Sequence, residues 1–463
     1  MKAQAAIHMD NWGNLNHKLG KSSPRVVPLA IILLLVTTVI LYYPFLGYPL
    51  SLSLFQDSLK LIPNNSSSPQ DSTQDPSELK LKEVLDDGKS IGKESITLPK
   101  NNHSLEFDSG DKRKKCNLFS GEWIWNPGGP SPYYTNETCY AIQDHQNCMR
   151  NGRPDSDFLK WKWKPHECEL PDFDGIQFLE ILRGKSLAFV GDSISRNHFQ
   201  SLVCLLAKVE YPEDHSTSPT AGSRHLKYKS YNFTMSVFWT PYLVKTMEEK
   251  SNGTPTGIIN IYLDEFDEEW TSQIWKFDYV IISAGQWFFR PIKFYEQGHI
   301  VGCQFCRELD IPHLSATYGY QKAFQTAFKA INTIEKYKGC TFLRTLSVSH
   351  FEDGPWDKGG NCVRKRPFRK NETSLKDYNV NMYNTQMKEF RVAKRQGWQR
   401  GLQYRLMNTT QVMLLRPDGH PSIYWQTKKD NRPGIDCVHW CLPGPIDTWN
   451  EFLLEMFKME EKR

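Results

Sequence analysis

The sequence predicts an α/β domain with a mainly parallel sheet covered by helices on both faces. Short apolar runs end in turns rich in Gly, Ser, His or Pro, and stretches of helical periodicity lie between them. Apolar strands that alternate with helices are typical of a buried parallel sheet, in which functional residues collect in the loops after the strands. The expected strands are residues 186–190, 279–283, 341–348 and 412–415, and the clearest expected helices are residues 321–334 and 388–406.

The N-terminal part of the chain predicts a membrane anchor. Residues 1–25 are polar and carry Lys18, Lys21 and Arg25 just before residues 26–50, which are almost uncharged and rich in Ile, Leu, Val and Tyr. A run of this length can cross a bilayer as a helix. The positive flank then predicts a cytosolic tail, a transmembrane signal anchor and a lumenal remainder, which is a single-pass type II topology. A cleaved signal peptide is the alternative, but no small-x-small site ends the run cleanly.

Residues 51–115 are rich in Ser, Pro, Asn, Asp and Lys and poor in aromatic residues, which predicts a flexible lumenal stem. A compact domain is expected from Cys116 to the end, residues 116–463. All 11 cysteines lie at or beyond Cys116, so this part is expected in an oxidising compartment with disulfides. Glycosylation triplets Asn-X-Ser/Thr on the same side of the apolar segment agree with that expectation; they start at Asn64, Asn65, Asn102, Asn136, Asn232, Asn252, Asn371 and Asn408.

The composition indicates which kinds of molecule the chain is expected to bind. The net charge of +5 is modest for 463 residues, and basic and acidic residues are interspersed, so nothing demands a nucleic-acid partner. The 14 tryptophans indicate a large core together with aromatic faces on which sugars can stack. The chain carries neither a Walker loop nor a dinucleotide fingerprint, so no bound phosphate-bearing cofactor is expected.

A strand, a sharp turn and a helix are predicted around Ser193. The apolar run ends at Val190, Gly191 and Asp192 follow, and helical spacing of apolar residues begins at Ile194. Such a turn presents Ser193 at the edge of the sheet and at a helix N-terminus, where backbone N–H groups can stabilise an oxyanion. Ser193 is therefore a candidate nucleophile if a base exists elsewhere. The alternative is a serine that only caps the helix.

A second expected strand, residues 279–283, is followed by Gly285. If both strands end at the same edge of the sheet, the Gly285 N–H can contribute to an oxyanion site. The alternative is a glycine that only permits a tight turn.

A candidate base lies near the C-terminus. Asp436 and His439 are three residues apart, so the carboxylate can hold one imidazole nitrogen and leave the other to accept a serine proton. Cys437 and Cys441 flank the histidine, and disulfides at these positions would hold it in place. His420, in a Pro-Asp-Gly turn, is a competing base. Ser193, His439 and Asp436 together form a complete nucleophile, base and orienting acid.

These motifs resemble the plant trichome birefringence-like proteins, Golgi polysaccharide O-acetyltransferases related to GDSL/SGNH esterases. The resemblance rests on Gly-Asp-Ser at residues 191–193 and on Asp-Cys-Val-His-Trp-Cys-Leu-Pro-Gly in residues 436–444, with Asp-Thr-Trp-Asn at 447–450. It covers residues 116–457 and implies an SGNH-like fold with Ser193, His439 and Asp436 as the triad. Gln286 and Asp357 stand where many members have His and Asn. With residues 302–306, these departures resemble the subgroup associated with xyloglucan and mannan rather than xylan.

The resemblance implies double displacement. His439 would deprotonate Ser193, Ser193 would accept an acetyl group from a donor of unknown identity, and a wall-polysaccharide hydroxyl would attack acetyl-Ser193. The oxyanion or binding candidates are Gly191, Asp192, Gly285, Asn197 and Arg196. The N–H groups of Ser193 and Gly285 and the Asn197 amide would hold the oxyanion, and Arg196 would orient the turn or meet the acceptor. The alternative for both Asn197 and Arg196 is an ordinary residue on the helix surface. The same triad with water as acceptor gives an acetylesterase. A non-catalytic glycan-binding wall protein is the third possibility, against which the intact triad argues.

The cysteines allow a partial pairing scheme. The expected positions around His439 favour Cys362 with Cys437 and Cys148 with Cys441. The family resemblance implies Cys116 with Cys168 and Cys139 with Cys204. Cys303 and Cys306 have zinc-like spacing, which Cys340 or His313 could complete, but disulfides are favoured in an oxidising lumen and no metal is expected.

Overall fold

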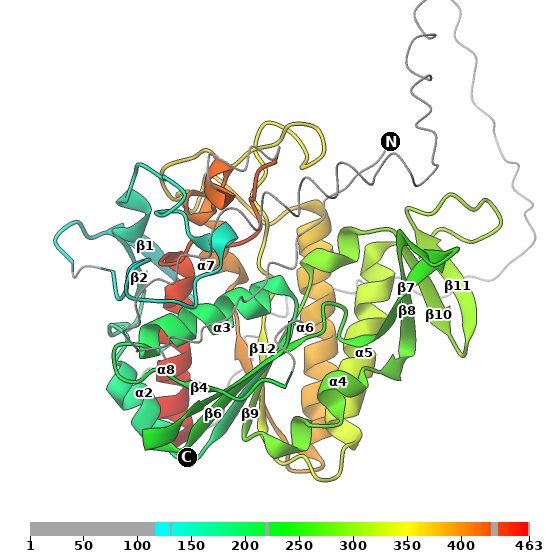
Figure 1. Cartoon of the computed structure of the whole chain (residues 1–463), viewed down its shortest axis with the longest axis horizontal. Coiled ribbons are helices and arrows are strands. Elements are labelled where there is room, and N and C mark those ends of the chain that lie inside the picture. Colours follow the sequence, from blue (N-terminus) through cyan, green and yellow to red (C-terminus); the bar gives the residue numbers. More distant parts are fainter. Residues whose placement is uncertain (1–115, 130–131, 218–221, 427–433, 462–463) are drawn as a thin grey trace, which may run out of the picture. The chain divides into compact units, whose positions relative to one another are not determined.

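The computed structural model describes residues 116–129, 132–217, 222–426 and 434–461 (Figure 1). The expected cytosolic tail, membrane anchor and stem, residues 1–25, 26–50 and 51–115, lie outside the described residues. Within the described ranges, no helix is both long and apolar enough to cross a membrane.

The centre of the domain is a seven-stranded sheet, and it confirms the prediction of a mainly parallel arrangement. Its strand order is β13-β12-β9-β3-β6-β5-β4. The first five strands in this order run parallel, whereas β5 and β4 are antiparallel additions at one edge. The strands are β3 (Ser186–Gly191), β4 (Glu213–Asp214), β5 (Arg224–Tyr228), β6 (Phe233–Trp239), β9 (Tyr279–Ser283), β12 (Cys340–Arg344) and β13 (Gln403–Met407).

Helices cover both faces, as predicted. Side chains of β3 alternate between two buried clusters: Leu187 and Phe189 belong to one, and Ala188 and Val190 belong to the other. Figure 1 shows α2, α3 and α8 on one side of the sheet and α4, α5 and α6 on the other. These helices are α2 (Gly175–Ile181), α3 (Ser193–Leu206), α4 (Glu268–Thr271), α5 (Ala316–Thr333), α6 (Asp377–Trp398) and α8 (Thr448–Glu461). A strand buried on both faces explains the continuous apolar run before Ser193.

The prediction for the last strand was wrong. Residues 412–414 lie in the short helix α7 (Thr410–Leu414), and Leu415 caps its C-terminus. The edge strand is instead β13, which overlaps the end of the expected helix 388–406. The preceding helix ends at Trp398, and Gly401 follows with a φ of +74°, which reverses the chain into β13. Apolar residues in a run of four fit a buried helical turn as well as a strand, so pattern alone could not separate the two.

Two smaller sheets were not predicted. A four-stranded sheet has the order β11-β10-β8-β7, with strands β7 (Val244–Ser251), β8 (Thr254–Phe266), β10 (Ile292–Glu296) and β11 (His299–Gln304). A hairpin pairs β1 (Gly121–Trp125) with β2 (Trp161–Pro165). In Figure 1 this cyan segment lies near α7 and the red helix α8. The Trp123 indole N–H donates to the Val412 carbonyl at 2.9 Å, which fastens the hairpin to α7.

Five disulfides join ten of the 11 cysteines, and all four predicted pairs are present. These are Cys116–Cys168, Cys139–Cys204, Cys148–Cys441 and Cys362–Cys437, and the fifth is Cys303–Cys306. Cys340 is buried in β12 and lies outside these bridges. Two of the bridges end on either side of His439, so they tie the C-terminal segment to two distant parts of the chain.

Removing the Cys148–Cys441 bridge should cost much more stability than removing Cys303–Cys306. The sequence separations are 293 and 3, and the chain-entropy relation gives on the order of 5 kcal/mol for the long loop and about 2 kcal/mol for the short one. The paired variants are Cys148→Ser/Cys441→Ser and Cys303→Ser/Cys306→Ser, compared by chemical denaturation. Equal losses in the two variants would contradict the anchoring role of the long bridge.

Candidate active site

The turn around Ser193 has the predicted form. Strand β3 ends at Gly191, Asp192 caps helix α3, and Ser193 is the first residue of that helix. A Cβ atom on Gly191 would lie 1.7 Å from the Ser283 carbonyl oxygen, and φ at this position is +153°. Only glycine therefore lets β3 approach the end of β9 so closely. Ser193 is buried, with 3% of its surface exposed.

The Asp192 carboxylate joins the two strand ends. Its Oδ1 accepts from the N–H groups of Ile194 at 3.0 Å and Ser195 at 3.4 Å. Its Oδ2 accepts from those of Gly285 at 2.9 Å and Gln286 at 3.3 Å. Burial raises the pKa of Asp192, and the Arg344 charge and these N–H groups act against that shift. The Asp192 carboxylate thus fixes the turn at Ser193 to the loop after β9.

Asp436 and His439 form the expected pair. The Asp436 Oδ2 lies 2.7 Å from the His439 Nδ1, and its Oδ1 accepts from the backbone N–H groups of Val438 and His439. Burial alone would raise the pKa of Asp436, but the facing imidazole outweighs it and holds that pKa well below its usual range. The His439 Nε2 is buried and has no hydrogen-bond partner in the described part of the chain. A histidine that accepts a proton from a serine hydroxyl needs a free ring nitrogen, and the Nε2 of His439 meets that need.

The base segment is tied directly to the first turns of α3. The Asn197 Oδ1 accepts from the Trp440 N–H at 2.8 Å, and the Asn197 amide donates to the Trp440 carbonyl at 3.3 Å. Asn197 lies one turn after Ser193, and Trp440 adjoins His439. The structure therefore brings the three expected triad residues into one region, although among the described residues no hydrogen bond joins the Ser193 Oγ to the His439 Nε2. Such bonds are often long before substrate binds.

The other expected site residues lie at the same edge but have other partners. The Gly285 N–H, expected to face an oxyanion, donates to Asp192, and the Asn197 amide donates to Trp440. The Gly285 N–H is therefore occupied, as is one of the two N–H groups of the Asn197 amide. The Arg196 guanidinium lies 4.6 Å from the centre of the Trp239 ring, and burial lowers its pKa to about 10. Gln286, which departs from the common family pattern, donates its side-chain amide to the Ser347 carbonyl at 2.6 Å.

His420, the competing base, is enclosed on both sides. Its Nε2 lies 2.7 Å from the His350 Nδ1, and its Nδ1 lies 2.7 Å from the His439 carbonyl oxygen. Its ring stacks on Trp440 at 4.1 Å between centroids. Burial lowers the pKa of His420 well below its ordinary value. With both nitrogens engaged, His420 supports the backbone of the base rather than offering a free nitrogen.

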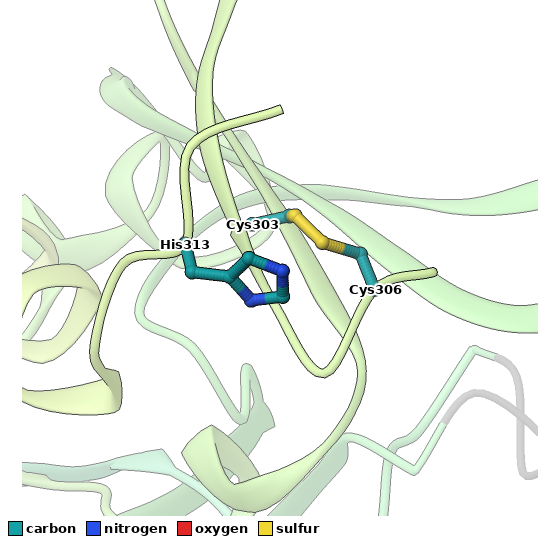
Figure 2. A group of neighbouring side chains, drawn as sticks. All are labelled: Cys303, Cys306 and His313. Atoms are coloured by element: carbon teal, nitrogen blue, oxygen red, sulfur yellow. A yellow bond between two sulfur atoms is a disulfide. The ribbon is translucent and has the colours of Figure 1, made fainter. Parts of the chain in front are cut away.

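The zinc-like cysteine pair is held as a disulfide. Cys303 and Cys306 are bonded to each other, and the His313 imidazole lies beside them (Figure 2). The backbone of His313 pairs with that of Cys303 through a parallel bridge. Zinc binds cysteine as the thiolate, which a disulfide does not offer. Of the three residues Cys303, Cys306 and His313, only His313 can therefore act as a ligand while the disulfide is intact.

One residue at the site, His145, was not predicted from the sequence. His145 lies in the 3₁₀ helix η2 (Asp144–Gln146), and its ring packs edge-on against His439 with 4.9 Å between centroids. The predicted Cys148–Cys441 pairing already implied that this segment lies near the base. The ring contact itself depends on the path of an irregular loop, which the sequence does not reveal.

A cavity of about 310 Å³ lies close to the base segment but does not include the triad. It is lined by the hairpin and by the start of α8, including Tyr133, Phe158, Trp161, Pro443 and Glu451. Burial raises the pKa of Glu451 to about 7, and the Tyr133 hydroxyl donates to Glu451 at 2.6 Å. The lining also includes Lys160, Lys162, Asp172 and Asp447, so the cavity combines aromatic and charged side chains.

Comparison with known proteins places these features in one family. The GDSL/SGNH-like acyl-esterase family found in Pmr5 and Cas1p matches residues 170–456, and the PMR5 N-terminal domain matches residues 114–169. Protein trichome birefringence-like 20 of Arabidopsis thaliana is 53% identical over 349 residues, which is 75% of this chain and 72% of that protein. The chain belongs to the trichome birefringence-like family. Xyloglucan O-acetyltransferase 4 of Populus trichocarpa is 42% identical over 347 residues, 74% of this chain and 81% of the relative.

Family membership agrees with how the site is built. The acyl-esterase match includes Ser193, Asp436 and His439, and the PMR5 N-terminal match includes His145 and Cys148. The N-terminal segment of this trichome birefringence-like protein is thus covalently joined to the residue two places after its candidate base.

Replacing Asn197 should weaken the link between nucleophile and base. Asn197→Ala leaves the buried Trp440 N–H and carbonyl without their side-chain partners, which should lower the free energy of unfolding by about 1–3 kcal/mol. Ser195→Ala is a matched control, because the buried Ser195 hydroxyl has no partner among the described residues. The measurement is chemical denaturation of both variants. A control as destabilised as Asn197→Ala would contradict the linking role.

Proposed function

We propose that this chain is an O-acetyltransferase that moves acetyl groups onto hydroxyls of a plant cell-wall polysaccharide. The observation that carries the proposal is the 2.7 Å contact between Asp436 and His439. It leaves the His439 Nε2 without a partner among the described residues, on a segment that is bonded to α3. Relatives named xyloglucan O-acetyltransferase, 39–42% identical to this chain, support a hemicellulose such as xyloglucan as acceptor, with mannan next and xylan less favoured.

The proposed reaction has two steps. In the first, His439 takes the Ser193 proton, the Ser193 Oγ attacks the acetyl carbonyl, and the donor leaves with a proton from His439. In the second, an acceptor hydroxyl gives its proton to His439 and attacks acetyl-Ser193; the Ser193 Oγ–carbon bond then breaks, and the Oγ takes the proton back from His439. Asp436 orients the imidazole and stabilises its charged form. The chain's own residues perform both steps, and the two reactants are an acetyl donor and the acceptor hydroxyl.

The oxyanion in each step needs donors that are not already engaged. Because Gly285 and Asn197 have other partners, the proposal assigns this role to the Ser193 N–H at the start of α3 and to the Arg196 side chain. The helix N-terminus favours negative charge at this point. The Arg196 Nε is buried and has no partner in the described ranges.

The proposed location is the Golgi membrane, with the catalytic domain in the lumen. The apolar run of residues 26–50 and its positive N-terminal flank support a single-pass type II anchor. Five disulfides support an oxidising compartment. In this arrangement residues 1–25 are cytosolic, residues 51–115 are the stem, and residues 116–463 are the lumenal catalytic domain.

Ser193→Ala should abolish acetyl transfer without unfolding the protein, because one small hydroxyl is removed from a turn held by Asp192. The lumenal part is incubated with para-nitrophenyl acetate and a xyloglucan oligosaccharide, and product masses are read. A gain of acetyl on the oligosaccharide supports transfer, whereas release of acetate alone supports an esterase. Binding without either product supports a glycan-binding protein. Wild-type turnover by a folded Ser193→Ala protein would remove Ser193 from the mechanism.

Asp436→Asn should lower turnover by up to about 10⁴, since an amide favours the wrong imidazole tautomer while the oxyanion donors remain. His439→Ala should be inactive. His420→Ala serves as the comparison, because both His420 nitrogens already have partners. Its effect should fall mainly on stability, as measured by thermal denaturation beside turnover. Greater loss of turnover in folded His420→Ala than in His439→Ala would reverse the choice of base.

A further inference from the structure

The N-terminal segment brings a second histidine to the proposed base and holds it firmly. Three residues after His145, Cys148 is bonded to Cys441. The Leu442 N–H donates to the Gln146 carbonyl at 2.9 Å, and the Asn151 amide donates to the Tyr424 carbonyl at 3.0 Å. These contacts fix the segment around His145 onto the chain on both sides of His439, so the contact between the two rings is built into the fold.

The two imidazoles differ in what they are bonded to. His439 has Asp436 at its Nδ1, whereas the Nε2 atoms of both rings are buried and lack partners within the described residues. The ring planes meet at 76°. Burial, reinforced by the neighbouring His439, lowers the pKa of His145 to about 3. His145 therefore stays neutral while His439 gains and loses a proton, and it does not compete for that proton.

A neutral imidazole offers one N–H donor and one acceptor nitrogen, which is the pattern that a hydroxyl group satisfies. A buried group of this kind that lacks a partner is costly, and a ligand hydroxyl would remove that cost. The charge of Arg196, one turn after Ser193, also acts to lower the pKa of His145. His145 thus lies beside the residues proposed to carry out transfer, and its Nε2 has no hydrogen-bond partner among the described residues.

We propose that His145 binds the acceptor, by a hydrogen bond to the sugar hydroxyl next to the one that attacks acetyl-Ser193. This inference rests on the proposed function and adds that the acceptor is a pyranose with two adjacent free hydroxyls. One hydroxyl gives its proton to the His439 Nε2 while its oxygen bonds to the acetyl carbon. The Ser193 Oγ–carbon bond then breaks, and the Oγ takes the proton from His439. His145 gains and loses no proton in this step.

The two half-reactions separate this role from a structural one. In His145→Ala, formation of acetyl-Ser193 from para-nitrophenyl acetate should stay within about twofold of wild type. Transfer to a xyloglucan oligosaccharide should fall about tenfold to a hundredfold, the effect of losing one buried hydrogen bond to the ligand, and more acetyl should end as acetate. His145→Gln should recover part of the transfer. His166→Ala, at an exposed histidine of the same N-terminal segment, is the control and should match wild type.

A modified acceptor tests the hydrogen bond itself. The probe is the same oligosaccharide with the hydroxyl next to the acetylated one replaced by hydrogen. Wild type should lose as much transfer with this probe as His145→Ala loses with the normal acceptor, and the variant should lose nothing further. If the losses of transfer from the His145→Ala change and from the modified acceptor add, the proposed role of His145 is wrong. The same holds if His145→Ala slows both half-reactions equally. Either result would leave the proposed function itself intact. A wild-type protein that never forms acetyl-Ser193 would instead overturn the proposed function.

Discussion

The proposed base lies on a segment without regular secondary structure, and its position depends on covalent and hydrogen-bonded ties to the rest of the domain. Cys437 and Cys441 of this segment form disulfides with Cys362 and Cys148. The backbone N–H and carbonyl of Trp440 are both hydrogen-bonded to the side chain of Asn197 in α3. His439 can meet Ser193 only if these ties hold, because nothing within residues 436–442 supplies the rigidity of a helix or strand. The N-terminal segment contributes to this arrangement, because Cys148 provides one of the two covalent anchors.

Burial keeps most of the histidines around the candidate base uncharged. Three histidines near the base, His145, His350 and His420, are held neutral because burial lowers their pKa values. Among these four histidines, only His439 has a carboxylate at hydrogen-bond distance, the Asp436 Oδ2 at 2.7 Å. Asp192 is also buried, but it accepts four backbone N–H groups and serves to hold two loops together. The two acids therefore have different tasks, which are set by their neighbours.

Much of this site could be predicted because its determinants are local. The strand, turn and helix around Ser193 follow from one apolar run and a capping aspartate, and the spacing of Asp436 and His439 already allows their contact. Gly285 and Asn197 were expected at the correct edge of the sheet, but their partners, Asp192 and Trp440, depend on how separate loops meet. The strand β13 was missed because Gly401 ends the preceding helix earlier than the apolar pattern suggests. His145 depends on the path of an irregular segment, which no periodicity encodes.

In the proposed mechanism, Ser193 carries the acetyl group between donor and acceptor. The most direct measurement is peptide mapping by mass spectrometry of wild-type protein quenched during reaction with an acetyl donor in the absence of acceptor. The account predicts one acetyl group on the peptide that contains Ser193, and its loss from that peptide with a matching gain on the sugar when a xyloglucan oligosaccharide is added. An active enzyme in which Ser193 is never acetylated, or in which the transferred acetyl group comes from another residue, would contradict it.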